Sequence, residues 1–434
     1  MYAQALRFLW CAFGMVVLVV PQAYAGDELT VDSLLAGSLL EQDEYDDADV
    51  FTDEVWVQEP IVVGQNDSLQ LSIEHTLAVN PSGSYERTNH YTEARLSSET
   101  PIGLLAYAEL ELKATHYWQG DTSKPTEGDF SHLDIQRLVL HYSLADISIK
   151  LGRYLLSWGE VEGAGVIDVI NPLPSLASSL TELTPQWLLS GNYYLPSAQV
   201  SWFVGLDPSV SELPGVALAH GVGKEWGAKY GHTGLGSDWA VYTGRMVPNN
   251  PVLNLATATA SAQSFPWIGY SWNKAIDGHL IKFDIAHKRG LEHNLGYMGL
   301  TRSHRLDAAL GLELNHGDRQ WSASVSGQRW LNYQSSYLTP TLTPALTPVA
   351  SHQTQVTYIL GLSDSFNADE YRWSLSHLDT ARGALRATTG ELVWQATDRW
   401  QSSLSYTTMT AKRNSAYALL DGTQRLILKA KLSY

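Results

Sequence analysis

The chain has 434 residues with 15 Trp, 22 Tyr and one Cys, and its formal net charge is −17. The acidity is concentrated in residues 26–60, which contain 12 Asp or Glu and no Lys or Arg. No basic face is visible in the remainder, which argues against nucleic-acid binding. Because the single cysteine, Cys11, lies within the first 25 residues, the rest of the chain can form neither disulfides nor thiolate metal sites.

The first 25 residues have the pattern of a secretory signal peptide. Arg7 supplies a positive charge, residues 8–20 are apolar, and residues 23–25 read Ala-Tyr-Ala, which fits the small-x-small rule for cleavage. The apolar run is short for an uncleaved membrane anchor. We therefore expect an exported protein whose mature chain starts near Gly26.

Apolar and polar residues alternate with a period of two from about residue 66. In residues 104–118, LLAYAELELKATHYW, the leucines and alanines share one face while Glu109, Glu111 and Lys113 share the other. A wet lumen tolerates such charges, whereas the dry core of a soluble sandwich does not. No later stretch approaches the ~18 apolar residues of a membrane helix, so a chain that enters a membrane must close into a barrel. The same alternation recurs at residues 279–288, 305–315 and 354–365.

Connections between these runs alternate between short and long, as in outer-membrane barrels with short periplasmic turns and long external loops. The pattern predicts an all-β fold, a transmembrane antiparallel β-barrel of about 18 strands, with 16 as the alternative. The long connections are expected near residues 119–132, 159–185, 207–222, 248–264 and 334–352. The strands are expected to start near residues 67, 88, 103, 133, 146, 185, 198, 223, 237, 265, 279, 304, 319, 353, 370, 386, 400 and 424.

The final segment, QRLILKAKLSY, alternates up to an aromatic end at Tyr434. It resembles the C-terminal assembly signal of outer-membrane barrels, although an amphipathic strand can also arise by chance. The resemblance implies two partners, outer-membrane lipid and the barrel assembly machinery. We expect the protein in the outer membrane of a Gram-negative bacterium.

The chain is thus expected to have three parts. Residues 1–25 are the signal peptide, residues 26–65 an acidic periplasmic N-terminal extension, and residues 66–434 the barrel. The extension is interpreted either as a solvated tail or as an element that docks a periplasmic partner or plugs the barrel.

Residues 151–176, LGRYLLSWGEVEGAGVIDVINPLPSL, break the alternation. A bulge at Gly152 is expected to turn Arg153 toward the lumen. The run VIDVINP is too apolar for an exposed loop, so residues 159–185 are predicted to fold inward and narrow the lumen. The residues expected to form the bulge, corner and cap of this constriction are Gly152, Arg153, Trp158, Gly159, Glu160, Asp168, Asn171 and Pro172.

The pattern LGRYLLSWGE…IDVINP resembles the Gly-Arg…Trp-Gly-Glu…Asp-Val-Ile-Asn-Pro motif of an uncharacterised outer-membrane barrel family. The resemblance is specific over residues 151–172 and architectural elsewhere. Members of that family are associated with RND/MMPL-type exporters and are grouped with alginate-export-type porins. The resemblance implies an outer component of an envelope export system, with a periplasmic or inner-membrane exporter as partner.

Charged residues on the predicted inner face have two readings. They form a mixed-charge pathway for polar or anionic solutes, or they pair across neighbouring strands and stiffen the wall. The candidates are Glu109, Glu111, Lys113, Arg137, His141, Lys150, Lys282, Asp284, Arg305, Asp307 and Glu313.

Catalytic signatures are absent from the sequence, since neither Gly-x-Ser-x-Gly nor His-Glu-x-x-His occurs. The acidic residues 43–49 lack the spacing of an EF-hand. We therefore expect no catalytic residues, no metal and no cofactor. The predicted function is a porin-like channel, or the outer component of an export system, that passes a polar or amphipathic solute. The alternatives are a docking barrel that receives a periplasmic partner through residues 26–60 and an outer-membrane hydrolase.

Overall fold

The fold is taken from a computed structural model of the chain. The expected signal peptide (1–25) and acidic extension (26–65) lie outside the residues that the structure describes. The described residues are 68–81, 87–118, 131–161, 163–167, 169–172, 183–211, 216–219, 221–234, 236–339, 348–380, 384–415 and 417–434.

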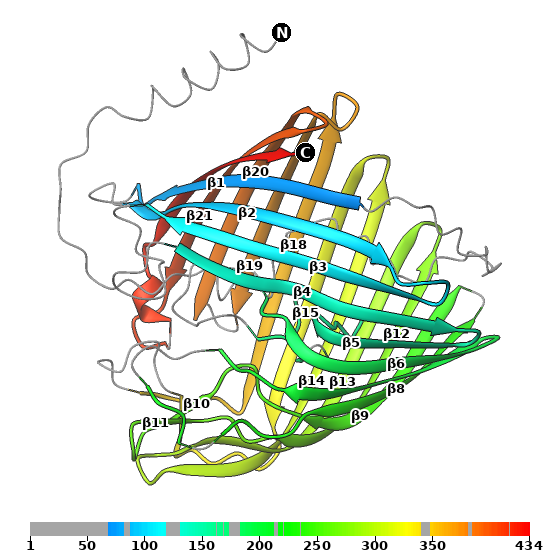
Figure 1. The fold of residues 1–434 in the computed structure, drawn as a ribbon. Coiled ribbons are helices and arrows are strands. Elements are labelled where there is room, and N and C mark those ends of the chain that lie inside the picture. The colour runs from blue at the N-terminus through cyan, green and yellow to red at the C-terminus, as the bar shows by residue number, and fades with distance from the viewer. Residues whose placement is uncertain are drawn as a thin grey trace.

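Eighteen antiparallel strands form the wall of a closed barrel (Figure 1). They are β1 (Ser68–Val79), β2 (Arg87–Pro101), β3 (Ala106–Tyr117), β4 (Ser131–Leu144), β5 (Ile147–Tyr154), β6 (Gln186–Leu195), β7 (Ala198–Asp207), β8 (Trp226–Gly234), β9 (Ser237–Met246), β12 (Phe265–Ile276), β13 (His279–Leu295), β14 (Leu300–His316), β15 (Arg319–Trp330), β18 (Thr354–Phe366), β19 (Tyr371–Thr380), β20 (Leu385–Thr397), β21 (Trp400–Ala411) and β22 (Gln424–Ser433).

The barrel closes where the last wall strand meets the first. β1 pairs with β2 along one edge and with β22 along the other. At the terminus, the Tyr434 N–H donates to the Leu71 carbonyl at 2.8 Å, and the Leu71 N–H donates back at 3.3 Å. β1 is therefore paired along both of its edges, as a strand in a barrel exposed to hydrocarbon requires.

The predicted count of 18 strands is confirmed, and the alternative of 16 is excluded. The expected starts fall within a few residues of the observed ones. The largest difference is at β14, which begins at Leu300 rather than 304. Its extra residues pair with β13 beyond a register shift between Arg289 and Leu291, where Gly290 adopts φ +75°. A bulge of this kind cannot be read from period-two alternation, because it resets the phase.

The outer face of the wall is apolar. In β1, Leu69, Leu71 and Ile73 are 67%, 37% and 40% exposed, whereas Thr76 on the opposite face is buried. Large exposed apolar side chains recur around the barrel, for example Ile268 in β12. Such a continuous band is unusual on a soluble protein and is typical of a barrel whose outer surface faces lipid.

Short turns connect the strands at one end of the barrel and longer connections at the other. The short-turn end also contains the start of β1 and the C-terminus. Tight turns there use left-handed residues, such as Asp277 at φ +50° and Gly278 at φ +79°. The long-loop end carries the small elements β10 (Val252–Asn254), β11 (Thr259–Ser261), β16 (Tyr337–Thr339), β17 (Val349–Ala350) and η2 (Ala418–Leu420). Within the described part of the chain, no helix has the length and apolar character needed to cross a membrane.

Candidate functional site

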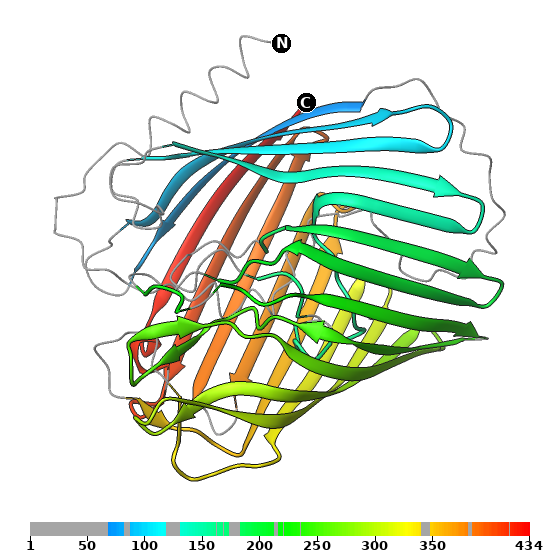
Figure 2. The same ribbon diagram turned by 60° about the horizontal axis from the view of Figure 1, so that its bottom comes forward.

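The chain leaves the wall after β5 and turns into the barrel, within the ring of strands (Figure 2). Trp158 is buried against the inner wall. Its ring centroid lies 5.0 Å from that of Phe203 in β7 and 5.7 Å from that of Tyr242 in β9. The wall makes room for the indole at Gly227 in β8, where an added Cβ would lie 2.7 Å from the Trp158 ring. The β5–β6 connection is therefore fitted to β7–β9 by shape.

The apolar run that follows is covered, as the sequence predicts. Val166, Ile167 and Ile170 are buried in one cluster with wall residues, among them Trp267 of β12. Full burial of each such aliphatic side chain stabilises the packed arrangement by about 1.5–3 kcal/mol. Residues 155–161, 163–167 and 169–172, which we call the inner loop, therefore pack onto the inner wall, whereas the sequence predicts an inward loop over residues 159–185. Asp168 and residues 173–182 of the predicted constriction lie outside the described residues.

Asp284 of β13 holds the corner of the inner loop. The Glu160 N–H lies 3.2 Å from both carboxylate oxygens of Asp284, and the Val161 N–H donates to Oδ2 at 3.0 Å. The Glu160 side chain is held in turn by Asn273, whose Nδ2 donates to Oε2 at 2.7 Å. Gly159 has φ +110°, and an added Cβ would lie 3.1 Å from Asp284 Oδ2. The sequence Trp-Gly-Glu thus serves to bring two backbone amides onto one carboxylate.

A second anchor lies further along the inner loop. Lys288 Nζ is 2.8 Å from Asp307 Oδ2 and donates to the Gly165 carbonyl at 3.2 Å. Arg305 binds the same Asp307 carboxylate through Nε and Nη2 at 2.7 and 2.8 Å. Lys288 and Asp307 are almost fully buried. Removal of Asp307 would leave Lys288 as a buried charge without its carboxylate, so this group fixes the loop against β13 and β14.

The base of the inner loop is closed by Asn171. Its Nδ2 donates to the Leu156 carbonyl at 2.9 Å, and its Oδ1 accepts the Leu156 N–H at 3.3 Å. Asn249 Nδ2 donates to the Asn171 carbonyl at 2.9 Å. The Pro172 carbonyl accepts the Thr184 N–H at 2.7 Å. Asn171 and Pro172 thus lie at the exit of the inner loop, where the sequence places a cap.

The bulge predicted at Gly152 is absent. β5 pairs in continuous register with β4 and β6 through this residue. Gly152 instead adopts φ +148°, with an added Cβ falling 1.9 Å from the Leu138 carbonyl oxygen, so glycine is needed for close backbone approach. Arg153 lies opposite Leu138 and is not redirected by a bulge; its guanidinium is 3.2 Å from Asp134. Moreover, β5 ends at Tyr154, so the inner loop begins before the predicted residue 159.

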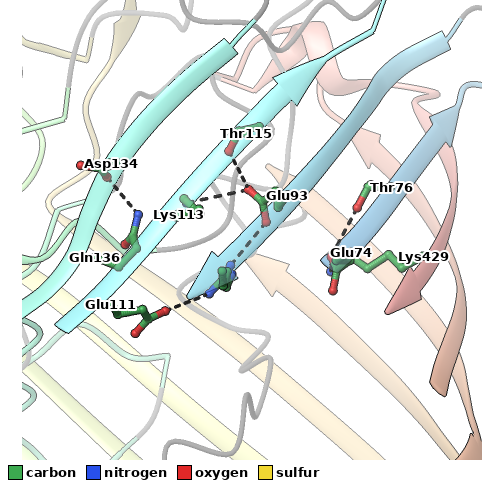
Figure 3. Close-up of polar contacts among 10 residues, drawn as sticks. Glu74, Thr76, Glu93, Glu111, Lys113, Thr115, Asp134, Gln136 and Lys429 are labelled. Atoms are coloured by element: carbon green, nitrogen blue, oxygen red, sulfur yellow. Dashed lines mark hydrogen bonds and ion pairs between the residues drawn. The ribbon is translucent and has the colours of Figure 1, made fainter. Parts of the chain in front are cut away.

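A ladder of alternating charges lines the inner faces of β22, β1, β2 and β3 (Figure 3). Lys429 Nζ lies 3.9 Å from Glu74. Glu93 lies 3.4 Å from Arg95 and 3.9 Å from Lys113, and Arg95 lies 3.7 Å from Glu111. Glu93, Arg95, Glu111 and Lys113 thus form one network across β2 and β3, and Lys429 and Glu74 form a neighbouring pair between β22 and β1.

The ladder continues onto β4. The Glu109 carboxylate accepts a hydrogen bond from Arg137 Nη1 at 2.9 Å and lies 2.8 Å from His141 Nε2. The His141 ring stacks on Tyr107 at a centroid distance of 4.1 Å. Lys150 of β5 pairs in register with His141, on the same face. Among the described residues Lys150 has no carboxylate within 4.0 Å.

The sequence candidates therefore separate into three groups. Glu109, Glu111, Lys113, Arg137 and His141 belong to the ladder, with Lys150 beside it. Lys282 and Glu313 form their own pair at 2.6 Å between β13 and β14. Asp284, Arg305 and Asp307 hold the inner loop, a role that neither sequence reading included.

Several residues of the site are missed by the sequence reading. Lys288 alternates like its neighbours, and nothing local marks it as buried.

The connection between β21 and β22 also packs onto the wall, because Leu420 of η2 is buried against Leu378, Leu385 and Met409 of β19–β21. In the described ranges no three His, Cys, Asp or Glu side chains gather closely enough to hold a metal ion.

Glu225, in the connection just before β8, joins the ends of three strands. Its Oε1 accepts the Val247 N–H at 3.2 Å, and its carbonyl accepts the Gly205 N–H at 2.9 Å. Its side chain is buried, and Oε2 has no hydrogen-bond partner among the described residues. Burial raises the pKa of Glu225 to about 8, although the bond from Val247 opposes the shift.

Comparison with known proteins finds solved structures with a similar fold. No protein-family model matches the chain, and no curated protein matches its sequence. Acinetobacter baumannii OccAB4 superposes with a TM-score of 0.57 and 9% identity, over 85% of this chain and 98% of that one. OccAB2 of the same species gives 0.55 and 8% over the same shares. The outer membrane protein opdK from Pseudomonas aeruginosa gives 0.53 and 7%, over 84% and 98%. At these identities the likeness shows the fold alone.

Replacing Asp284 by Ala is expected to release the corner of the inner loop. The Glu160 and Val161 amides lose a charged acceptor, so their hydrogen–deuterium exchange should speed up by about tenfold or more. Glu313→Ala is the matched control, because Glu313 is an inner-face carboxylate of the next strand that pairs with Lys282. Equal protection of residues 156–167 in both variants would contradict the anchoring role.

The raised pKa of Glu225 predicts that the stability of the folded protein depends on pH. Because the pKa is raised from 4.5 to about 8, the folded protein keeps a proton that the unfolded chain releases, so stability falls as pH rises through this window. Glu225→Gln keeps the acceptor for Val247 and stays neutral. The two proteins should melt alike near about pH 5, and the wild type should melt lower near about pH 8.5. An identical pH dependence in thermal melts would rule out this effect.

Proposed function

We propose that the protein is a porin-like channel in the outer membrane of a Gram-negative bacterium and passes a polar or amphipathic solute without chemical change. The observation that carries the proposal is the division of the inner wall. The inner loop packs on the inner surface of β6–β14, where apolar side chains surround the charged anchors Asp284 and Lys288–Asp307, while β22 and β1–β4 present the charge ladder. Solute would pass along the polar half, beside the packed loop.

The chemistry of the ladder suits a solute with charged or hydroxyl groups. Carboxylates and cations alternate along it, so a passing group can exchange one partner for the next without losing all its hydrogen bonds. The polar surface extends past the ladder, since Thr389 of β20 and Thr407 of β21 share a hydrogen bond at 2.8 Å on the inner face. Its mixed charge favours polar and zwitterionic solutes over those of a single sign.

In its finer form, the proposal is that the channel is the outer component of an envelope export system. Two sequence features support it, namely the motif at residues 151–172 and the acidic stretch at residues 26–60, which would dock a periplasmic or inner-membrane exporter. The C-terminal strand ending at Tyr434 would be recognised by the barrel assembly machinery. A docking barrel closed by its loop is the rival function, favoured by the burial of Trp158, Ile167 and Ile170.

Deleting residues 159–180 is expected to raise single-channel conductance in planar bilayers. The inner loop fills part of the cross-section, so its loss should increase conductance by about twofold or more. Because the deletion bares apolar wall and can impair folding, Asp284→Ala is the second variant and should give larger conductance fluctuations. Silence of the wild type and of both variants would reject a channel and leave the docking barrel.

Ion selectivity tests the ladder. Glu109→Gln with Glu111→Gln removes two inner carboxylates, so the cation-to-anion permeability ratio should fall by about twofold or more in reversal-potential measurements at low salt. Asp364→Asn serves as the control, because this carboxylate pairs with Arg319 near the short-turn end. An unchanged ratio in the double variant would show that solute does not pass along the ladder.

A further inference from the structure

The outer face of β9–β15 carries a cluster of basic side chains at the long-loop end. The register aligns them in two adjacent rows. In one row Arg245 pairs with Pro266, and Arg289 pairs with His304. In the other row Ile268 pairs with His287, and Leu306 pairs with Arg329. We call Arg245, His287, Arg289, His304 and Arg329 the basic patch.

Alternation along each strand shows that these residues face outward. Arg245, Arg289 and Arg329 are exposed, while their neighbours Met246 and Lys288 are buried inside the barrel. Ile268, in the same row as His287, is 53% exposed. The patch therefore directly adjoins the apolar band, at the level where the band ends.

Among the residues that the structure describes, no carboxylate neutralises the arginines of the patch. Neither Arg289 nor Arg329 has a carboxylate within 4.0 Å among the described residues, and Arg245 donates only to the Ser264 hydroxyl at 2.6 Å. The nearby carboxylate of Glu292 is already taken by Arg302, at 3.3 Å, and by Ser261. On β19–β20, by contrast, Arg386 is paired with Asp379 at 2.9 Å.

The spacing of the cations suits more than one anionic group. Arg245, Arg289 and Arg329 lie on every second strand of the wall, which separates neighbouring members by roughly 10 Å. Each guanidinium offers a planar fork of N–H donors that matches phosphate oxygens. The His287 and His304 rings, with centroids 5.8 Å apart, lie beside the arginines on β13 and β14 and add N–H donors.

We propose that the basic patch binds the headgroup of a lipid that carries two phosphates, in the outer leaflet around the barrel. The proposal rests on the barrel being embedded in the membrane, but not on its being a channel. Cations at the edge of a lipid-facing apolar band lie at the depth of lipid headgroups, and an anionic headgroup can supply the counter-charge that no described carboxylate provides. The acyl chains of the same lipid would cover Ile268 and Leu306.

The test uses the full folded chain in detergent and measures lipid binding by native mass spectrometry. The probes are bisphosphorylated lipid A, monophosphorylated lipid A, phosphatidylcholine and inorganic phosphate. We expect affinity to decrease in that order. Arg289→Gln with Arg329→Gln should weaken binding of the bisphosphorylated lipid by about tenfold or more, with unchanged planar-bilayer conductance.

Arg319→Gln with Arg399→Gln is the matched control, since it removes the same charge near the short-turn end. Equal loss of binding in the control, or no loss in the patch variant, would overturn the proposal. Inorganic phosphate that binds as tightly as the lipid would overturn the assignment to a lipid. A silent wild-type barrel that still binds the lipid through the patch would reject the channel and leave the lipid site intact.

Discussion

The contact between Asp284 and the backbone amides of Glu160 and Val161 is the interaction on which the interior of the barrel depends. It joins the connection after β5 to β13, across several intervening wall strands. A carboxylate that accepts backbone N–H groups away from water makes strong, charge-assisted hydrogen bonds. Once the corner is fixed there, the apolar run behind it can settle on the inner wall instead of exposing its side chains to water.

This placement divides the interior chemically. An apolar inner wall is unusual for a wide barrel, whose lumen is ordinarily wet and polar. Here the rings of Phe203, Tyr242 and Trp267 would meet water if the inner loop were absent, and the loop would be equally unstable without them. The inner loop and the apolar wall therefore stabilise each other. The charges of the ladder, on the other half, pair with residues of neighbouring strands and do not need the loop.

The sequence predicts the wall well and the site only in part, for a physical reason. Alternation with period two is local, so strand number and inward-facing residues follow from short windows. The hydrogen-bond partners of those residues cannot be predicted from short windows. Asp284 is recognisable as inward-facing, but the backbone amides that donate to it lie 124 and 123 residues away. Gly152 shows the same limit, because a glycine in a strand marks either a bulge or a close approach, and only the Leu138 carbonyl distinguishes them.

β13 shows how one strand can serve both surfaces. Asp284 and Lys288 point inward and hold the inner loop, while His287 and Arg289 point outward beside the apolar band. Successive side chains of a strand point to opposite faces, so the adjacent residues Lys288 and Arg289 place one cation inside the barrel and one on its outer surface. The register shift at Gly290 then ends this arrangement, since Leu291 returns to the buried cluster. A one-residue slip of β13 would move Lys288 into the lipid and Arg289 into the loop, so the inner anchor also fixes the register of the outer patch.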